Sequence, residues 1–287
     1  MTMKVVTWNI QWGLGCDGRV DLARIVSDAR ALCDADVFCF QEISHGFTPY
    51  DNDQNQPQRL ADLLPDHRPV FRPAVDITAR DGKRQVFGNM ILSRLPVLQV
   101  TSHMLPWPAT EAKTMQRQGL ETIVLSAFGP ISITTCHLEF HAAEHRKAQV
   151  DALLQVHAER TRRGRLSFCE SADSPYRTIA PAVAALICGD FNFEPDDVLH
   201  AAMQQQVAED IPAFVDVWAA ANPGMPHPPT AGVADAAQWP GGPHCRDFIF
   251  VTENLGQSIV DVRVDTATTA SDHQPVAVTF NARTRGD

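Results

Sequence analysis

The chain has 287 residues, of which 44% are hydrophobic and 20% are charged, as in an ordinary folded globular protein. Its 34 acidic residues outnumber 24 basic ones, which gives a net charge of −10 at pH 7. Proteins that hold long nucleic acids through their phosphates generally present a basic face, so this balance favours a small ligand or a short contact.

The first residues, MTMKVVTWNI, begin a strand pattern at once and lack the basic and apolar regions of a secretory signal. No apolar run approaches the length of a membrane span. The seven cysteines are odd in number and lie mostly in apolar runs, which is typical of reduced thiols. We therefore expect a cytoplasmic protein with no membrane insertion and no obligate protein partner.

Short apolar runs alternate with segments of helical periodicity, and no repeat or linker divides them, so we expect one domain over residues 1–287. In chain order the predicted elements are a strand at Lys4–Ile10, a helix at Asp21–Cys33, strands at Asp36–Phe40, Asn89–Ser93, Leu120–Ser126 and Ile131–His137, a helix at Ala143–Glu159, a strand at Val183–Cys188, a helix beginning at Pro195, and strands at Phe248–Thr252, Ile259–Val264 and Pro275–Phe280.

Two long segments lack such a pattern, Thr161–Ala180 and the Pro/Gly-rich stretch Asn222–His244. Loops of that length inside a domain are more often functional than accidental. The second leads directly into Asp247, so it either selects substrate or is a plain surface connection.

Polar residues stand where the apolar runs stop or begin. Four early runs are closed or followed by Asn9, Glu42, His137, and Asp190 with Asn192; two later runs are preceded by Asp247 and by Asp272 with His273. In a purely parallel sheet these two groups would line opposite rims. They converge only if later strands run antiparallel to earlier ones, so a common site requires mixed sheets.

A common site would bring together the four carboxylates of Glu42, Asp190, Asp247 and Asp272. Carboxylates at such short distances repel one another, and a hard divalent cation relieves the repulsion. Donor sets of Glu, Asp and Asn oxygens suit Mg²⁺ or Mn²⁺ better than zinc. For any single residue, capping of its own strand is the simpler interpretation; the repetition at successive strand ends favours a shared site.

Two other clusters have simpler explanations. His137, His141 and His145 recur every four residues, but His137 ends a predicted strand, so the three do not share a helical face as a zinc site would require. The arginines at positions 160, 162, 163 and 165 follow a predicted helix. Interaction with the helix dipole accounts for them better than a phosphate-binding patch does.

The motifs, taken in order, resemble those of the endonuclease/exonuclease/phosphatase superfamily. The matching pieces are TWNI at Thr7–Ile10, QE at Gln41–Glu42, GNMILSR at Gly88–Arg94, TCHLE at Thr135–Glu139, GDFN at Gly189–Asn192, RDFIF at Arg246–Phe250 and SDH at Ser271–His273. They span almost the whole chain. The resemblance implies an α/β fold, a four-layer sandwich of two mixed β-sheets packed face to face with helices on the outside.

The resemblance also implies roles at matching positions. Metal binding falls to Glu42 as principal ligand, with Asn9, Asp190 and Asp272 near the same ion. The implied catalytic residues are Asp190 and Asn192, which would position water and phosphate. His137 and His273 are also implied as catalytic, with His273 oriented by Asp247. Substrate contact falls to Arg117 and Asn89; a solvated arginine at the start of a strand is an equal alternative for Arg117.

Two departures argue against abasic-site repair. Exonuclease III-type members usually lack a histidine where His137 stands, and they tend to carry a lysine where Ser44 stands. We expect a Mg²⁺- or Mn²⁺-dependent phosphoester hydrolase, with the phosphodiester of a small or modest substrate favoured. The alternatives are a DNA or RNA nuclease of the same fold and a catalytically inactive binding protein, against which the filled chemical positions argue.

Overall fold

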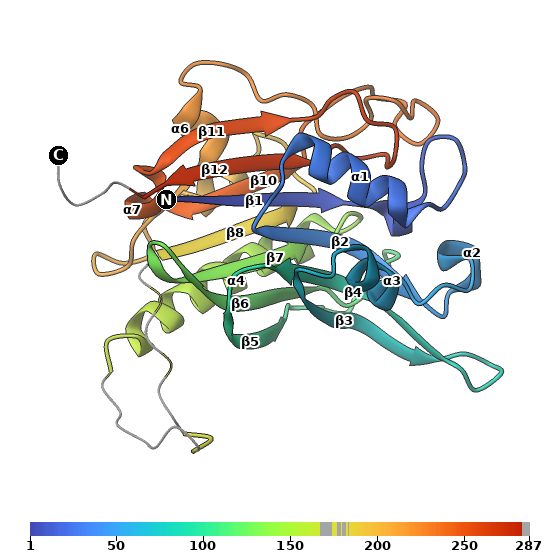
Figure 1. The fold of residues 1–287 in the computed structure, drawn as a ribbon, viewed down its shortest axis with the longest axis horizontal. Helices are drawn as coiled ribbons and strands as arrows, with labels where there is room; N and C mark the ends of the chain where they lie inside the picture. Colours follow the sequence, from blue (N-terminus) through green and yellow to red (C-terminus); the bar gives the residue numbers. More distant parts are fainter. Residues whose placement is uncertain (167–173, 177–178, 180–181, 183, 283–287) are drawn as a thin grey trace.

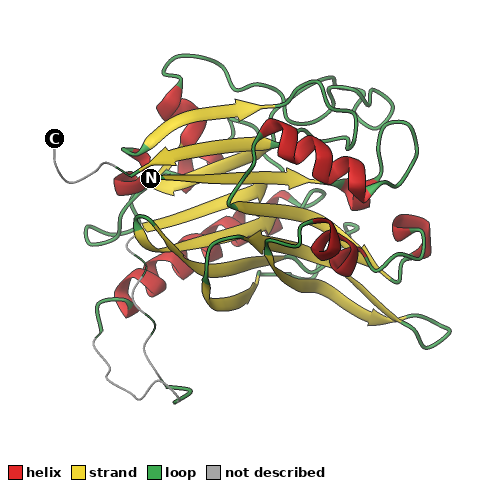
Figure 2. Ribbon diagram, in the orientation of Figure 1, coloured by secondary structure: helices red, strands yellow, loops and turns green. Residues whose placement is uncertain are grey.

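A computed structural model of the protein describes residues 1–166, 174–176, 179, 182 and 184–282. Its strands form two six-stranded sheets that lie face to face (Figures 1 and 2). The first sheet contains β1 (Thr2–Asn9), β2 (Val37–His45), β3 (Arg68–Thr78), β4 (Arg84–Ser93), β11 (Ile259–Val264) and β12 (Val276–Asn281). The second contains β5 (Val97–Met104), β6 (Gln118–Ser126), β7 (Gly129–His137), β8 (Ala184–Asp190), β9 (Phe214–Asp216) and β10 (Asp247–Thr252).

Both sheets are mixed, as the sequence predicts. The strand orders are β11-β12-β1-β2-β4-β3 and β5-β6-β7-β8-β10-β9. At the centre of each sheet lies one parallel pair, β1 with β2 and β7 with β8. Antiparallel strands flank it on both sides, β12 and β4 in the first sheet and β10 and β6 in the second. Each sheet therefore brings the carboxyl ends of two central strands beside the amino ends of the two strands that flank them.

The helices cover the outer faces of the sheets and complete the predicted sandwich (Figure 2). They are η1 (Gln11–Gly13), α1 (Leu22–Leu32), α2 (Thr48–Asp51), α3 (Gln56–Leu63), α4 (Ala143–Arg163), α5 (Val198–Met203), α6 (Val217–Ala221) and α7 (Glu253–Gly256). Apolar side chains of α1 and α3 pack on the first sheet, and those of α4 and α5 pack on the second. A third cluster fills the space between the sheets. No helix among the described residues is long and apolar enough to cross a membrane.

The helices at Asp21–Cys33 and Ala143–Glu159 are confirmed. Asp21 caps α1, since its carboxylate accepts hydrogen bonds from the first turn. The helix predicted from Pro195 begins three residues later, at Val198, because Asp197 is its cap. The predicted loop Thr161–Ala180 begins inside α4, and most of the rest of it lies outside the described residues.

Candidate active site

The central strands of both sheets end at one place. Asn9 ends β1, His137 ends β7 and Asp190 ends β8, while Glu42 lies in β2. Strand register sets His137 directly beside Asp190. From the antiparallel strands, Asp247 begins β10 opposite Asp190, and Asp272 with His273 precede β12. The predicted convergence of the two groups is what the structure shows.

Asp190 lies at the centre of this cluster and is 2% exposed. Its Oδ2 accepts a hydrogen bond from Asn9 Nδ2 at 3.0 Å and faces the Nε2 atoms of His137 and His273 at 3.4 and 3.7 Å. Burial by itself would raise the pKa of Asp190. The facing His273, with the hydrogen bonds from Asn9 and the Asn192 backbone, outweighs burial and holds that pKa below its ordinary value, so the carboxylate stays ionised.

Glu42 is the more accessible carboxylate of the cluster, with its side chain 15% exposed. Its Oε1 accepts a hydrogen bond from Asn9 Nδ2 at 3.0 Å, so one amide bridges Glu42 and Asp190. Burial and then the nearby Asp272 raise the pKa of Glu42 to about 7. A cation bound beside Glu42, Asp190 and Asp272 would offset the repulsion among these carboxylates.

Asp247 and His273 form a buried pair, with Asp247 Oδ2 2.8 Å from His273 Nδ1. That contact orients the ring, with Nε2 facing Asp190. Although burial opposes a charge on His273, Asp247, Asp190 and Asp272 raise its pKa well above the ordinary value. The imidazolium form is therefore favoured, which suits contact with an anion.

Asp272 is held by the long segment Asn222–His244. Its Oδ2 accepts hydrogen bonds from Gln238 Nε2 at 2.8 Å and from Trp239 Nε1 at 3.0 Å. The Trp239 ring also lies 5.8 Å from that of His273. This segment is thus part of the site and not a plain surface connection.

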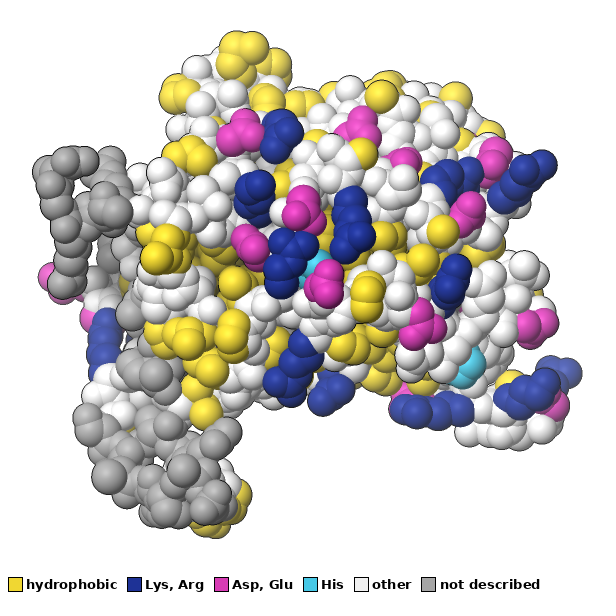
Figure 3. Space-filling model, in the orientation of Figure 1, with side chains coloured by type: hydrophobic (Ala, Val, Ile, Leu, Met, Phe, Trp, Pro, Cys, Tyr) yellow, Lys and Arg dark blue, Asp and Glu magenta, His cyan; other side chains and the backbone are white. Residues whose placement is uncertain are grey.

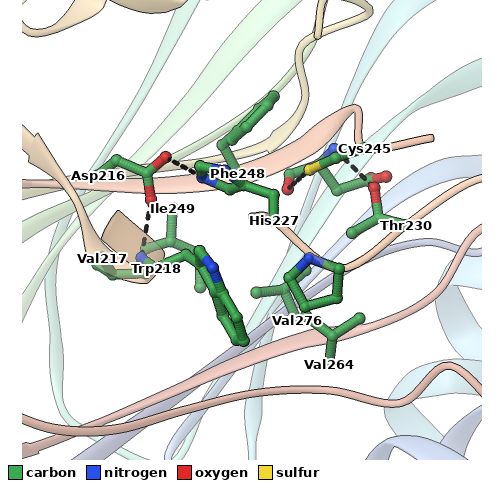
Figure 4. Close-up of a pocket in the computed structure, with 12 residues that line it drawn as sticks. Asp216, Val217, Trp218, His227, Thr230, Cys245, Phe248, Ile249, Val264 and Val276 are labelled. Carbon is green, nitrogen blue, oxygen red and sulfur yellow. Dashed lines mark hydrogen bonds and ion pairs between the residues drawn. The ribbon is translucent and has the colours of Figure 1, made fainter. Parts of the chain in front are cut away.

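The first part of the segment Asn222–His244 is held in place next to a small pocket of about 10 Å³ (Figure 4). Asp216 Oδ2 accepts hydrogen bonds from His227 Nε2 at 2.7 Å and from His200 Nε2 at 2.8 Å. Despite burial, these two bonds lower the pKa of Asp216 to about 2. The contacts have hydrogen-bond lengths and the space holds no more than a water, so we interpret the cluster as an anchor for the loop.

Asn192 and Arg117 both face the main cavity. The side-chain amide of Asn192 donates to the Leu138 carbonyl at 3.0 Å, and its Oδ1 accepts from Arg246 Nη1 at 3.4 Å. Arg246 is itself held over the rings of Phe140 and Trp239, its Cζ 5.4 and 5.1 Å from their centroids.

Arg117 is only 6% exposed and pairs with Glu139 at 3.4 Å, so it is not a solvated arginine. Asn89 lies elsewhere, since it does not line the cavity and its amide donates to the Gln118 and Thr135 carbonyls of the second sheet. Substrate contact by Asn89 stays a prediction.

One cavity of about 640 Å³ opens onto the cluster. Its lining includes Glu42, Arg117, His137, Asp190, Asn192, Asp272 and His273, together with residues to which the sequence pattern assigns no role: Gln11, Trp12, Phe47, Tyr50, Val75, Ile77, Phe87, Lys113, Thr114, Met115, Glu139, Phe140, His141, Gln238 and Trp239. His141 reaches the cavity, whereas His145 is buried on α4, so the three spaced histidines do not form a metal cluster.

The backbone around the cavity is strained. Of the six described non-glycine residues with positive φ, four line the cavity: Gln11, Trp12, Glu42 and Asn192. Such conformations cost of order 1–3 kcal/mol each and cluster at functional sites, where surrounding structure holds them. The position of Glu42 is thus imposed by the fold, whereas asparagine, as at Asn192, adopts this conformation more readily.

Two mixed sheets packed face to face with helices outside are the fold of the endonuclease/exonuclease/phosphatase class of proteins. The chain belongs to the Endonuclease/Exonuclease/phosphatase family, whose family model matches residues 6–273. Members of that family generally hydrolyse phosphoester bonds and use divalent metals. Among curated proteins, no sequence match was found.

Solved structures share the fold at low sequence identity. An endonuclease/exonuclease/phosphatase from Beutenbergia cavernae has 22% identity and a TM-score of 0.66, with 97% of this chain and 71% of that chain covered. Humanized D. rerio TDP2 has 19% identity and a TM-score of 0.62, with 98% and 99% covered. The human Nocturnin catalytic domain, with a bound sulfate anion, has 16% identity and a TM-score of 0.63, with 98% and 93% covered.

Proposed function

We propose that this protein is a divalent-metal-dependent hydrolase that cleaves the phosphodiester bond of a small or modest-sized substrate. The observation that carries the proposal is the ionised, buried Asp190 between Asn9, His137 and His273 at the inner end of the cavity. A buried carboxylate so placed can position and deprotonate water, which is the central requirement of phosphoester hydrolysis.

The donor set fits a hard cation. Glu42, Asp190 and Asp272 offer carboxylate oxygens, and Asn9 Nδ2 donates to two of them, Glu42 and Asp190, and so positions them for the ion. We propose that these four residues hold Mg²⁺ or Mn²⁺, with Glu42 as the principal ligand. When bound, the ion would neutralise charge on the non-bridging phosphate oxygens.

The remaining polar residues would hold the phosphate and stabilise its developing charge. His273, charged and oriented by Asp247, would donate Nε2–H to a phosphate oxygen. Burial and then Arg117 lower the pKa of His137 to about 3, so His137 is neutral and offers one N–H. Asn192, held by Arg246, would donate its amide to the phosphate beside the attacking water.

A small substrate is favoured by cavity size and charge. A volume of about 640 Å³ lies within the usual range for small-molecule sites. Over the centre of the face in Figure 3, basic and acidic side chains of the described residues are interspersed. The sulfate held by the Nocturnin domain supports an anion site in this fold. All six described cysteines are free, which supports the expected reducing, cytoplasmic location.

The proposal is tested with phosphomonoesters, small phosphodiesters and plasmid DNA, each with Mg²⁺, Mn²⁺ or EDTA. We expect metal-dependent cleavage of the diester, with kcat/KM that falls only modestly between low and physiological salt. Each phosphate contact on duplex DNA would instead add a slope of about −0.9 in the logarithm of affinity against the logarithm of salt concentration. Efficient, steeply salt-dependent plasmid cleavage would identify a nuclease. No cleavage of any substrate would favour a binding protein.

A further inference from the structure

The cavity has a second wall that the catalytic cluster does not use. It consists of uncharged side chains from η1, from the segment that includes α2, and from β3 and β4: Trp12, Phe47, Tyr50, Val75, Ile77 and Phe87. Tyr50 and Ile77 are 43% and 49% exposed. Apolar side chains of separate segments that gather on one open surface generally mark a binding site.

Trp12 is directed into this wall by an unusual backbone. Its φ and ψ are 45° and 26°, a left-handed conformation that bulky residues rarely adopt. The buried Gln56 holds it there: Gln56 Nε2 donates to the Trp12 carbonyl at 2.6 Å, and Gln56 Oε1 accepts from Ser44 N in β2 at 3.0 Å. Trp12 is partly exposed in a cavity at a backbone position that a glycine would fit better, and strained residues of this kind cluster at functional sites.

The rings of Trp12, Phe47 and Tyr50 form one continuous surface, with no gap between them that a ligand could enter. The Trp12 and Tyr50 centroids are 4.6 Å apart at 42°, and those of Phe47 and Tyr50 are 6.2 Å apart. No ring fits between neighbours this close, so a planar group would lie against their outer face. Arg117, His137 and His273, which can donate hydrogen bonds to an anion, line the same cavity, so an anion and an uncharged ring can be bound at once.

We propose that this aromatic wall, Trp12 with Phe47, Tyr50 and Phe87, binds a planar aromatic substituent of the substrate, an aryl group or a nucleobase. The inference rests on the proposed function, because it takes the phosphoester at Asp190 as the anchor of that substituent. Aromatic faces favour planar rings over saturated groups of similar size, because stacking adds to the gain from apolar burial. The wall thus determines substrate specificity, while the strand-end cluster performs the reaction.

The test compares the binding of phenylphosphonate, cyclohexylphosphonate and methylphosphonate by calorimetry in the presence of Mg²⁺. We expect phenylphosphonate to bind roughly tenfold more tightly than methylphosphonate and more tightly than cyclohexylphosphonate. Tyr50→Ala and Trp12→Gly, which suits the left-handed backbone, should remove this preference and leave methylphosphonate binding unchanged. Tyr176→Ala is the matched control, since Tyr176 is 80% exposed and outside the cavity lining.

Equal affinities for the phenyl and methyl compounds, or no binding of phenylphosphonate at millimolar concentration, would overturn the inference. Tighter binding of the cyclohexyl compound would overturn it in favour of an aliphatic substituent. Because phosphonates are not hydrolysed, the result is independent of turnover. If the protein prefers phenylphosphonate but cleaves no substrate, the inference about the aromatic wall holds and the proposed function is wrong. If the protein cleaves a substrate but shows no such preference, the proposed function holds and the inference about the wall is wrong.

Discussion

Replacement of Gly189 by alanine should damage the site by separating β7 from β8. Gly189 immediately precedes Asp190 and has a φ of +137°. A Cβ at this position would lie 1.9 Å from the Cys136 carbonyl oxygen, whereas real Cβ atoms stay at least 3.0 Å away, so the two strands must part by about 1.1 Å. The carbonyl oxygen belongs to the backbone and the position of a Cβ is fixed by the backbone, so no side-chain rotation can relieve the contact.

The parting falls directly on the proposed catalytic groups, because Cys136 precedes His137 and Gly189 precedes Asp190. The distance of 3.4 Å between His137 Nε2 and Asp190 Oδ2 would change by a comparable amount. Misplacement by about 1 Å costs on the order of 100-fold in rate, so kcat/KM should fall by about that factor. Backbone strain of about 3 kcal/mol should also lower the Tm by about 5 °C or more.

Both quantities are measured by steady-state kinetics on the small diester and by calorimetric melting. Gly119→Ala is the control, since a Cβ there meets only the ends of side chains, Leu153 Cδ2 at 3.1 Å and Thr134 Cγ2 at 3.3 Å. It should change kcat/KM by less than about threefold, because flexible side chains can move aside. A Gly189→Ala protein with wild-type Tm and kcat/KM would refute the geometric reasoning.

Three further changes test other parts of the structure. Glu42→Gln should abolish tight Mn²⁺ binding in calorimetric titration, because it removes the principal carboxylate; unchanged affinity would contradict the ligand assignment. Asp190→Asn should lower kcat by roughly a thousandfold with Tm preserved, since it removes the group that activates water; near-normal kcat would make Asp190 a strand cap. Burial lowers the pKa of His157 to about 4. Between about pH 6.5 and 4, this histidine is therefore protonated in the unfolded chain and neutral in the folded protein. The free energy of unfolding should decrease as the pH is lowered through this range, by up to about 3 kcal/mol. His157→Gln should flatten this loss in urea midpoints measured from pH 7 to 5, and an unchanged slope would exclude His157 as its source.

The strand ends of the site were predictable because a polar residue after an apolar run is visible in the sequence. That pattern found Asn9, His137 and Asp190, and the reversed order at Asp247 and Asp272 predicted mixed sheets. Three strands, β3, β5 and β9, were missed. All are edge strands, and β3 contains two prolines, so they lack the continuous apolar pattern of the central strands.

The rest of the cavity could not be predicted, because it depends on tertiary folding. Trp12, Tyr50 and Trp239 come from segments far apart in the chain, and no spacing relates them. The left-handed backbone of Glu42 is equally invisible, since glutamate has no preference for it. Sequence patterns identify groups that a strand presents, and they do not identify walls assembled from loops.

The order of the strands has a consequence for how the protein is made. Residues Val97–Thr252 supply the whole second sheet, whereas the first sheet pairs β1, at the start of the chain, with β12, at its end. During synthesis the second sheet can be complete while the first still lacks β11 and β12. Asp272 and His273 lie just before β12, so the nascent chain places the last residues of the proposed site only when this distant pairing closes. A ribosome-bound chain that ends before β12 would carry a nearly finished fold and an incomplete active site.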